Sequence, residues 1–473
     1  MHTKSMQTVM QNWLPDIRNA QGPLYLAISA AIGRDVEERR LNPGDRLPPQ
    51  RELAEALGVD TGTVTRAYAE ARRQGLIDAE GRRGSFVRGK AAFDASSQVP
   101  PFDTGMNLPP IPSSSSYAAS FANALQAVLE GPAAANRLQY QPAGGAPEDR
   151  AAGAQWLAAS GMEATEDNVI VTSGAQTALH AVVSSVLAPG DIVCTGPFVY
   201  PGWSAICRRH GVAIVPLGAD RHGIDPDAFA RACETGAVQS TPVRAIYLVP
   251  DNDNPTTATL SEERRRRIAE IARRHDVLII EDDPYSRLGS GEIPSLAALA
   301  PERTWHVASL SKLVSPSLRV AYLRAPQLRD ALRLATDTYE TTIMAPPLNL
   351  AVCTQWLNTG KWASLVAEVR DECLARQAIA AGILPHGSYE AARAGYHLWI
   401  ALEREGQSAD LVRALRPLGI SVVSGEQFRI DPEARHAVRI SIGGSADRQC
   451  IERALKMVDA MIHHQDGRFS PMV

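Results

Sequence analysis

The residues with the clearest chemical potential form the short motif Ser309-Leu310-Ser311-Lys312, which Arg319 follows seven residues later. A lysine can form a Schiff base with an aldehyde, and burial lowers its pKa so that more of the nucleophilic neutral amine is present. The hydroxyls of Ser309 and Ser311 and the guanidinium of Arg319 could bind a doubly charged phosphate beside it. Alone the motif is weak, because a surface lysine is the commoner explanation.

A second motif, Glu281-Asp282-Asp283-Pro284-Tyr285, directly follows the apolar segment 277–280. A carboxylate such as that of Asp282 can pair with a protonated pyridine nitrogen and keep the ring an electron sink. Tyr285 could reach a phenolic oxygen of the same ring. Adjacent aspartates are also typical of a helix N-cap and first turn, a role that would suit Asp283.

Three further motifs each follow an apolar segment. Asn254-Pro255-Thr256 offers an amide for the phenolic oxygen, although Asn-Pro also simply favours a turn. Ser173-Gly174-Ala175-Gln176 could bind an anion at a helix N-terminus or merely cap an ordinary helix. Pro197-Phe198-Val199-Tyr200 places Tyr200 to stack on an aromatic ring. Each ordinary explanation suffices for one motif, but five such anchors in one chain favour a single phosphate-bearing pyridine cofactor.

These motifs follow strand-like apolar segments that alternate with helical ones, which predicts an α/β domain with a mainly parallel sheet covered on both faces. Ligands of such sheets bind beyond the carboxyl ends of the strands, so we expect the motifs to meet at one edge. The predicted strands are 169–171, 191–193, 213–215, 245–249, 277–280 and 305–308, and the clearest helices are 176–187 and 262–275.

The N-terminal part has a different pattern. Leu24, Ile28, Ile32 and Val36 recur every four residues, which predicts one helix. Further helices are predicted over 51–57, ended by Gly58, and over about 61–74. Short strands at 76–78 and 85–87 would form a hairpin. Three helices followed by a hairpin predict a winged helix-turn-helix.

Polar residues of this part suit contacts with double-stranded DNA. Residues 23–88 hold 11 arginines against 10 acidic residues, so the alternative, ordinary solvated surface charge, has some weight. DNA is favoured because the candidates concentrate on the expected contact elements. They are Arg51 on the second helix, Thr61, Thr63, Thr65 and Arg66 on the third, and Arg82 and Arg83 at the hairpin tip.

Composition bounds the remaining possibilities. The chain has 473 residues, 45% hydrophobic and 21% charged, with a net charge of −4, which excludes disorder as the main state. Six scattered cysteines without a CxxC pair indicate neither a zinc site nor a disulfide framework, and no metal site is predicted. No signal peptide and no apolar run of about 18 residues is found, so we expect a cytoplasmic protein with no membrane partner.

Residues 91–116, rich in proline and serine, are predicted to be a linker. They would separate a DNA-binding domain at 1–90 from a large domain at 117–473. In the large domain, a smaller α+β subdomain is expected from roughly residue 350 to the end.

Two resemblances sharpen these predictions. The segment Gly44–Ala54, followed by Leu57-Gly58-Val59, resembles the winged helix of GntR-type regulators, although many relatives have an arginine where this chain has Thr61. The motifs at the strand ends resemble, in content and order, those of fold-type I aminotransferases over residues 103–463. Together they resemble MocR/GabR-type transcriptional regulators, in which a GntR winged helix is fused to an aminotransferase-like domain.

The second resemblance implies pyridoxal 5′-phosphate as cofactor and a role for each residue. Lys312 is similar to the lysine that forms the internal aldimine, and Asp282 to the partner of the pyridine nitrogen. Tyr285 and Asn254 are similar to the ligands of the phenolic oxygen, and Arg439 to the clamp on a ligand α-carboxylate. The phosphate cradle would comprise Ser173, Gly174, Ala175, Ser309, Ser311 and Arg319, with Tyr200 stacking on the ring and Tyr140 reaching the phosphate of a neighbouring subunit.

The resemblance therefore implies a DNA-binding regulator that senses an amino compound, or pyridoxal phosphate, through aldimine chemistry at Lys312. The family forms a domain-swapped, head-to-tail homodimer. An active aminotransferase acting on an α-amino acid is the alternative, and a DNA-binding protein with a cofactor-free scaffold is a third. Two departures from the aminotransferase pattern, Thr257 in place of a glycine and Thr195-Gly196 in place of an acidic residue, bear on the enzymatic alternative.

Overall fold

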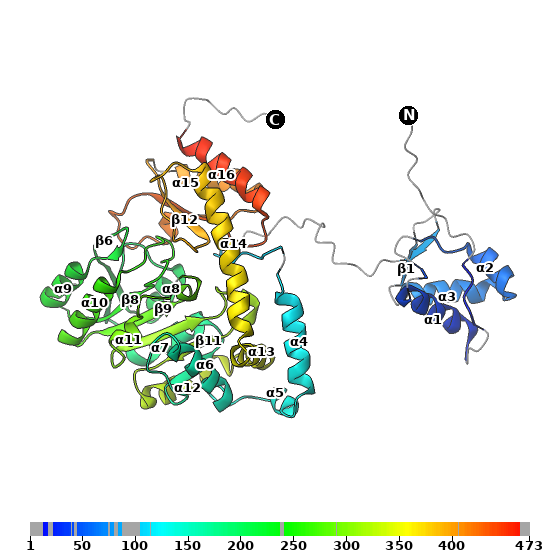
Figure 1. Ribbon diagram of the computed structural model, residues 1–473, viewed down its shortest axis with the longest axis horizontal. Helices are drawn as coiled ribbons and strands as arrows, with labels where there is room; N and C mark the ends of the chain where they lie inside the picture. Colours follow the sequence, from blue (N-terminus) through cyan, green and yellow to red (C-terminus); the bar gives the residue numbers. More distant parts are fainter. Residues whose placement is uncertain are drawn as a thin grey trace. The chain divides into compact units, whose positions relative to one another are not determined.

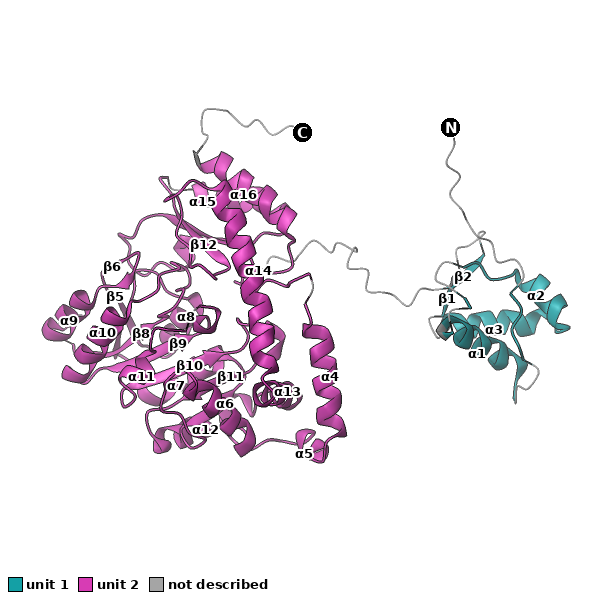
Figure 2. Ribbon diagram, in the orientation of Figure 1, with its two compact units in different colours: residues 1–99 teal, residues 100–473 magenta. Residues whose placement is uncertain are grey.

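The chain divides into two compact units, residues 1–99 and 100–473 (Figure 2). In the computed structural model, none of the helices among the described residues is long and apolar enough to cross a membrane. All six cysteines are free thiols. The residues that the structure describes are 13–17, 22–38, 40–41, 45–73, 76–79, 84–87, 105–113, 115–236, 241–289, 291–404 and 406–463.

The N-terminal unit has the predicted order of three helices and a hairpin (Figure 1). Gly58, with φ +62°, ends the second helix, and the Asp60 carboxylate accepts hydrogen bonds from the backbone N–H groups of Gly62 and Thr63 at the start of the third. Trp13, which the sequence patterns did not single out, joins the core and donates to Asp35 at 2.7 Å. The elements are α1 (Leu24–Glu37), α2 (Gln50–Leu57), α3 (Thr61–Arg73), β1 (Ile77–Ala79) and β2 (Ser85–Val87).

The larger unit is built on a sheet in which seven described strands run in the order β3-β11-β10-β9-β8-β4-β5. Only β11 is antiparallel to its neighbours, so the predicted mainly parallel α/β sheet is confirmed. The strands are β3 (Val169–Thr172), β4 (Ile192–Thr195), β5 (Ala213–Pro216), β8 (Val243–Leu248), β9 (Leu278–Asp283), β10 (Thr304–Ser309) and β11 (Ala321–Arg324).

Both faces of the sheet are covered because successive side chains of each strand point to opposite sides. On β8, Tyr247 enters one hydrophobic core and Ile246 and Leu248 enter the other. The first core includes α6 (Pro147–Ala158), α7 (Ala175–Val186), α8 (Pro201–Arg209) and α12 (Leu328–Thr342), and the second α9 (Pro226–Thr235), α10 (Glu262–Arg274) and α11 (Leu296–Leu299).

The C-terminal part carries a second, three-stranded antiparallel sheet in the order β12-β14-β13. Its helices lie beside it at the end of the long helix α14 (Figure 1). Its elements are α14 (Lys361–Ile383), β12 (His397–Ala401), α15 (Gln407–Leu415), β13 (Val422–Ser424), β14 (Ala437–Ser441) and α16 (Arg448–His463). The helices α4 (Tyr117–Glu130), α5 (Ala134–Arg137) and α13 (Pro347–Asn358) complete the unit.

Residues 105–113, which lie within the stretch predicted as a linker, pack on this larger unit. The backbone N–H of Ile111 donates to the carbonyl of Gly444, and the N–H of Gly444 donates to the carbonyl of Leu108. Asn107 is 1% exposed. The second half of the proline-rich stretch is therefore part of the folded unit.

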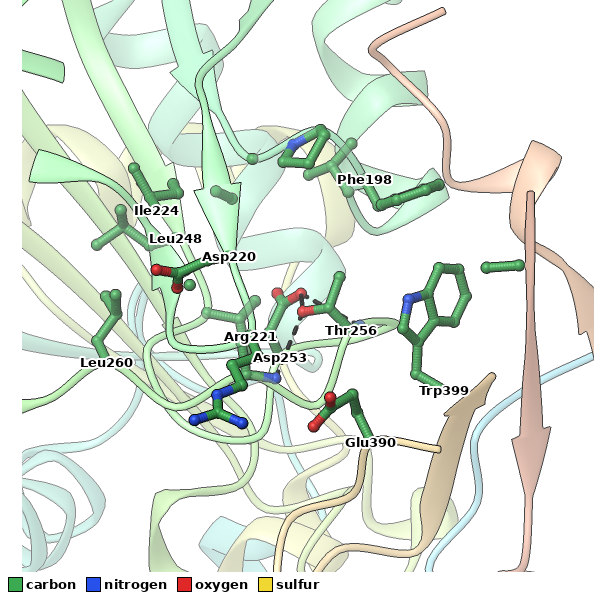
Figure 3. Close-up of a pocket in the computed structure, with 18 of the residues that line it drawn as sticks. Phe198, Asp220, Arg221, Ile224, Leu248, Asp253, Thr256, Leu260, Glu390 and Trp399 are labelled. Carbon is green, nitrogen blue, oxygen red and sulfur yellow. Dashed lines mark hydrogen bonds between the residues drawn. The ribbon is translucent and has the colours of Figure 1, made fainter. Parts of the chain in front are cut away.

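A cavity of about 300 Å³ lies between the large sheet and the small one (Figure 3). The large-sheet side includes Tyr247 and the loop after β8, together with the short hairpin of β6 (Ala219–Asp220) and β7 (Gly223–Ile224). The small-sheet side includes Trp399 of β12 and Ala437 of β14. This cavity is distinct from the site described next, since its lining includes neither Lys312 nor Arg439.

Candidate active site

The predicted residues meet at the carboxyl edge of the parallel strands. Asp282 lies near the end of β9, and Lys312 follows β10 by three residues. Charge interactions connect Lys312 with Asp282, Arg319 and Arg439, although the last lies far away in sequence. The geometry therefore brings the lysine, the acid and both arginines to one site, as the parallel topology predicts.

Lys312 is the chemical centre of this site. Its amine donates a hydrogen bond to the backbone carbonyl of Asn107. Burial, followed by the charge of Arg439, lowers the pKa of Lys312 to about 8. About one-tenth of such an amine is neutral at pH 7, far more than of an ordinary lysine. The site thus holds a nucleophilic amine near neutral pH.

Asp282 supplies a buried acceptor that lacks a donor. Its Oδ2 accepts a hydrogen bond from the Tyr247 hydroxyl at 2.9 Å, whereas its buried Oδ1 has no partner. Burial raises the pKa of Asp282 to about 7. A buried acceptor without a donor is costly, and a protonated ring nitrogen would satisfy it.

An anion cradle lies at the start of α7. Gly174 caps this 12-residue helix with φ +86°, and Arg319 donates to the Ser173 carbonyl at 3.0 Å. A Cβ atom at position 174 would lie 2.9 Å from the Arg319 guanidinium, so only glycine leaves this space open. The Ser311 hydroxyl is buried without a partner, and the backbone N–H of Ser311 donates to Ser309. Helix dipole, guanidinium and hydroxyls together suit a phosphate.

Tyr285 and Asn254 complete the predicted cofactor contacts. Tyr285 is 3% exposed, and burial raises its pKa to about 12. The Oδ1 of Asn254 accepts a hydrogen bond from Arg439 at 2.9 Å, which fixes this amide oxygen on the guanidinium. Burial likewise raises the pKa of Tyr200. Phosphate cradle, ring partner, phenolic-oxygen donors and amine fit pyridoxal phosphate.

Asn107 and His397 are central residues that the sequence analysis missed. The Asn107 amide donates to the Tyr285 hydroxyl at 3.2 Å and to His397 Nδ1 at 3.0 Å, and its Oδ1 accepts from Ser441 at 3.0 Å. His397 then donates from Nε2 to the Asp253 carbonyl. Burial lowers the pKa of His397 to about 3, so this histidine is neutral. A lone asparagine in a proline-rich stretch gave no periodic signal.

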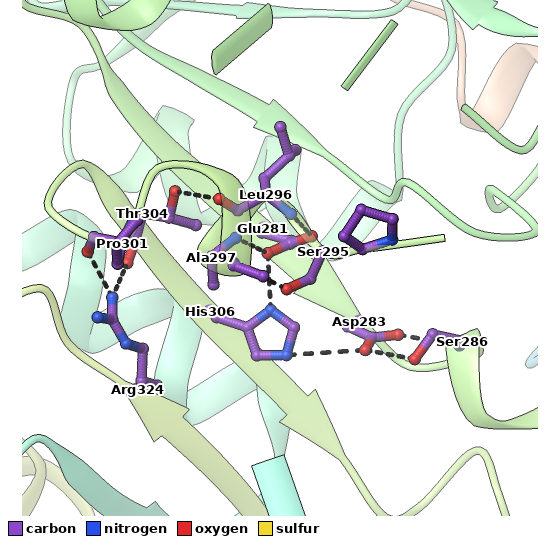
Figure 4. Close-up of polar contacts among 12 residues, drawn as sticks. Glu281, Asp283, Ser286, Ser295, Leu296, Ala297, Pro301, Thr304, His306 and Arg324 are labelled. Carbon is purple, nitrogen blue, oxygen red and sulfur yellow. Dashed lines mark hydrogen bonds and ion pairs between the residues drawn. The ribbon is translucent and has the colours of Figure 1, made fainter. Parts of the chain in front are cut away.

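A buried charge network joins Glu281 and Asp283 of β9 to His306 (Figure 4). Because successive side chains of a strand alternate, these two acids lie on the face of β9 opposite Asp282. His306 on β10 is fully buried, and its Nδ1 lies 2.8 Å from Glu281, which also accepts from the N–H groups of Leu296 and Ala297. Asp283 accepts from the backbone and hydroxyl of Ser286, so it caps a turn as the alternative explanation predicts. This network fixes the end of β9 and hence the position of Asp282.

The loop after Asn254 contains a strained residue. Thr257 has φ +63° and is 6% exposed, at the position where the aminotransferase pattern has glycine. A β-branched residue in this conformation costs on the order of 1–3 kcal/mol. We expect Thr257→Gly to raise the free energy of unfolding by about 1 kcal/mol, measured by urea denaturation.

Thr256→Gly is the matched control, because the Thr256 hydroxyl donates to Asp253 at 2.6 Å and its φ is ordinary. That variant is expected to lose about 1–2 kcal/mol. Equal losses from both variants would show that Thr257 carries no strain.

The candidate DNA contacts lie on α2 and α3 as predicted. Arg51 and Arg66 are exposed, and the Arg66 guanidinium lies 5.5 Å from the ring centroid of Tyr25. Thr65 donates to Gln50 at 2.8 Å and Thr63 to Asp60 at 3.4 Å, so both hydroxyls have partners within the unit. Arg82 and Arg83 lie outside the described residues.

Comparison with known families shows to which family the chain belongs. The family "Aminotransferase class I and II" matches residues 112–458, most of the chain. The chain belongs to this aminotransferase family. A second family, "Bacterial regulatory proteins, gntR family", matches residues 24–87. A GntR unit joined to an aminotransferase class I/II unit confirms the predicted resemblance to MocR/GabR-type regulators.

Similar proteins share both parts of this aminotransferase-family chain. An uncharacterized HTH-type transcriptional regulator of Bacillus subtilis, YdeF, is 26% identical and covers 98% of this chain and 99% of its own length. TauR of Rhodobacter capsulatus, an HTH-type transcriptional regulator, is 29% identical and covers 92% of this chain and 96% of its own length. PtsJ of Salmonella typhimurium, a vitamin B6 salvage pathway transcriptional repressor, is 27% identical and covers 89% of this chain and 94% of its own length.

Solved structures confirm the aminotransferase fold. The kynurenine aminotransferase of Pyrococcus horikoshii superposes with a TM-score of 0.69 at 22% identity, covering 76% of this chain and 90% of that one. Aspartate aminotransferase of Thermus thermophilus superposes with a TM-score of 0.64 at 21% identity, covering 88% and 97%. The predicted fold-type I architecture is therefore correct.

Proposed function

We propose that this protein is a pyridoxal-phosphate-dependent transcriptional regulator that binds DNA through its N-terminal unit and senses an amino compound at Lys312. The observation that carries the proposal is that one chain joins a GntR-family unit to a site with a buried amine and a buried carboxylate, one oxygen of which has no donor. When bound, pyridoxal phosphate supplies an aldehyde that reacts with primary amines and a ring that withdraws electrons.

The chain's own residues would hold this cofactor and its ligand. Ser173, Gly174 and Ala175 would bind the phosphate with Ser309, Ser311 and Arg319. Asp282 would keep a proton on the ring nitrogen, and Tyr285 and Asn254 would donate to the phenolic oxygen. Lys312 would hold or release a proton at Nζ, and its lowered pKa favours the neutral form. Arg439 would orient a ligand through its carboxylate.

A screen of primary amines and amino acids tests the proposal. We expect one class of amine to change the visible absorbance of the cofactor-loaded protein and also its affinity for promoter DNA. An absorbance change without any effect on DNA affinity, for every amine, would contradict a sensing role. Protein that stays colourless after addition of pyridoxal phosphate would favour a cofactor-free scaffold.

Aminotransferase activity remains the second candidate, because one site holds Lys312, Asp282 and Arg439 together. These are the groups that a half-transamination requires: an amine for proton transfer, a partner for the ring and a carboxylate clamp. Turnover with an amino acid and a keto acid, followed as release of the new keto acid, distinguishes this candidate. A ligand that binds without turnover favours the regulator.

The ligand clamp gives a specific prediction. Arg439→Lys keeps the charge but loses the paired geometry that binds a carboxylate with two hydrogen bonds. We expect the affinity for an α-amino acid ligand to fall about 10- to 100-fold, whereas the affinity for the corresponding decarboxylated amine changes less than about threefold. Absorbance titrations measure both. The control is Arg413→Lys, since Arg413 has an 80% exposed side chain on α15.

DNA binding gives a second prediction. Arg51→Ala is expected to weaken binding to DNA fragments selected by the wild-type protein by about 5- to 50-fold. A plot of log affinity against log salt concentration should become less steep by about one unit if Arg51 contacts a phosphate. Arg72→Ala is the control, because Arg72 is exposed in the last turn of α3, away from its N-terminus. Equal effects of both variants would contradict a specific contact.

A homodimer is part of the proposal. Tyr140 is 74% exposed, so it contributes little to its own subunit and is free to reach a second copy. Other large apolar side chains of the larger unit are also more than two-fifths exposed. They include Leu129 and Leu138, which are near Tyr140 in sequence, and Leu328, Leu332, Tyr339 and Ile343 on and after α12. Such surface is typical of a subunit interface. Tyr140→Phe would weaken cofactor binding only if the Tyr140 hydroxyl contacts the cofactor phosphate bound in the partner subunit.

A further inference from the structure

The cavity between the two sheets has walls that are mostly apolar (Figure 3). Phe198 follows β4, Ile224 belongs to the β6–β7 hairpin, and Leu260 lies in the loop before α10. Trp399 closes the small-sheet side, and its ring meets that of Phe198 edge-on at 5.0 Å. About 300 Å³ is enough for a small molecule of one ring and a short substituent.

Three carboxylates lie in this lining, and only that of Asp253 is set back from the surface. The other charged side chains of the lining are exposed, namely Asp220, Arg221, Glu390 and Arg435. The Oδ2 of Asp253 accepts from the Thr256 hydroxyl at 2.6 Å and is drawn in the middle of the cavity lining in Figure 3. Among the residues that the structure describes, no arginine or lysine forms an ion pair with Asp253, and burial raises its pKa to about 6. A second carboxylate, Glu390, lies at the exposed rim beside Trp399.

The Asp253 carboxylate differs from that of Asp220, the other aspartate of the lining. Asp220 accepts a charged hydrogen bond from Arg264 at 2.6 Å and is half exposed. The charge of Asp220 is therefore already balanced, whereas that of Asp253 is balanced only by neutral donors. A partly buried carboxylate in a cavity that also holds aromatic rings can bind an organic cation, through charge and through the ring faces.

We propose that the cavity is a second ligand site, separate from Lys312, for a small organic cation with an apolar body. The apolar body would lie against Phe198, Leu260 and Trp399, and the cationic group would lie beside Asp253. The proposal goes beyond the sensing of amines at Lys312, because no covalent bond to the ligand is involved.

The second site shares residues with the first. Tyr247 lines the cavity and donates its hydroxyl to Asp282. The carbonyl of Asp253 accepts from His397, and the next residue, Asn254, accepts from Arg439. A ligand in the cavity would therefore contact residues that position the partner of the cofactor ring and the carboxylate clamp, which is the physical basis for coupling between two sites.

The test uses the full-length, cofactor-loaded protein and benzyltrimethylammonium, a quaternary cation that cannot condense with an aldehyde. Isothermal titration calorimetry should show saturable binding, with an affinity about tenfold higher than that of benzylacetone, a neutral molecule of similar size. The anion hydrocinnamate should bind more weakly than either. No saturable binding of the cation, or equal affinities for the cation and the neutral molecule, would overturn the proposal.

Three variants locate the site. Asp253→Asn should remove the roughly tenfold preference for the cation while binding of benzylacetone is retained, and Asp220→Asn, the matched control, should change neither affinity more than about twofold. Ile224→Trp should fill the cavity and abolish binding of both molecules. Unchanged cation binding in a folded Asp253→Asn protein, or in a folded Ile224→Trp protein, would place the site elsewhere and overturn the proposal.

The coupling has its own readout. Saturation with benzyltrimethylammonium should shift the visible absorbance of the bound cofactor in the wild-type protein and not in Ile224→Trp. Calorimetric binding without any spectral shift would overturn the coupling but leave the site. These outcomes are independent of DNA binding, so failure of the regulator proposal is distinguishable.

Discussion

Replacing Lys312 with alanine is expected to abolish the visible absorbance of the protein loaded with pyridoxal phosphate. The amine is the only group at the site that could bind the aldehyde covalently among the residues described here, and its lowered pKa makes it reactive near neutral pH. We expect the affinity for the cofactor to fall at least about 100-fold and the response of DNA binding to amines to disappear. Absorbance titrations and DNA binding with and without amine measure these effects.

Basal DNA affinity of the Lys312→Ala protein should stay within about twofold of wild type, because the N-terminal unit is compact by itself. Lys456→Ala is the control, since Lys456 forms an exposed ion pair with Glu452 on α16. If Lys312→Ala retains both colour and the amine response, another residue must hold the cofactor.

Asp282→Asn is expected to make the cofactor-free protein more stable and to weaken its binding of the cofactor. Without the cofactor, ionisation of this buried acid costs stability, because burial raises the pKa of Asp282 from 3.8 to about 7. The rise corresponds to at most about 4 kcal/mol of lost stability well above pH 7. The neutral amide avoids the ionisation cost, although one of its groups remains without a partner.

The sign of the pH effect follows from the raised pKa. The penalty on wild type is absent below about pH 4, grows between about pH 4 and pH 7, and is constant at higher pH, because the folded state disfavours the ionised acid. We therefore expect the cofactor-free Asp282→Asn protein to be more stable than cofactor-free wild type by about 1–3 kcal/mol at pH 8, and by much less at pH 5. Urea denaturation at the two values measures this difference.

Cofactor binding should respond in the opposite direction. An amide cannot hold a proton on the ring nitrogen as a carboxylate does, so Asp282→Asn is expected to weaken cofactor binding about 10- to 100-fold. The control is Asp410→Asn, because the Asp410 side chain is 63% exposed on α15. A variant that binds cofactor as tightly as wild type would contradict the role of Asp282.

The chemistry of the site was predictable because each anchor follows a strand of the parallel sheet. Lys312, Asp282 and Tyr285 occur in compact motifs, and apolar segments before them fix their place at one edge. The end of α2 was equally clear, since Gly58 takes a positive φ. Local sequence rules are sufficient for such features.

Asn107, Tyr247 and His397 could not be predicted in the same way. Each acts through a partner that lies distant in sequence: Asn107 through Tyr285 and His397, and Tyr247 through Asp282. Tyr247 is a single hydroxyl in an apolar strand, and Asn107 lies in a stretch whose composition indicated a linker. Contacts of this kind depend on the tertiary fold rather than on spacing along the chain.

The place where the polypeptide enters its larger unit has a mechanical consequence. Asn107 lies eight residues beyond Val99, where the N-terminal unit ends. Its carbonyl accepts a hydrogen bond from the Lys312 amine, and its side-chain amide donates one to Tyr285. A ligand that reacts with this amine would compete with the Asn107 carbonyl for it. Asn107 would then keep only the side-chain contacts described above, with Tyr285, His397 and Ser441, so occupancy of the site would first change the segment that begins at residue 105.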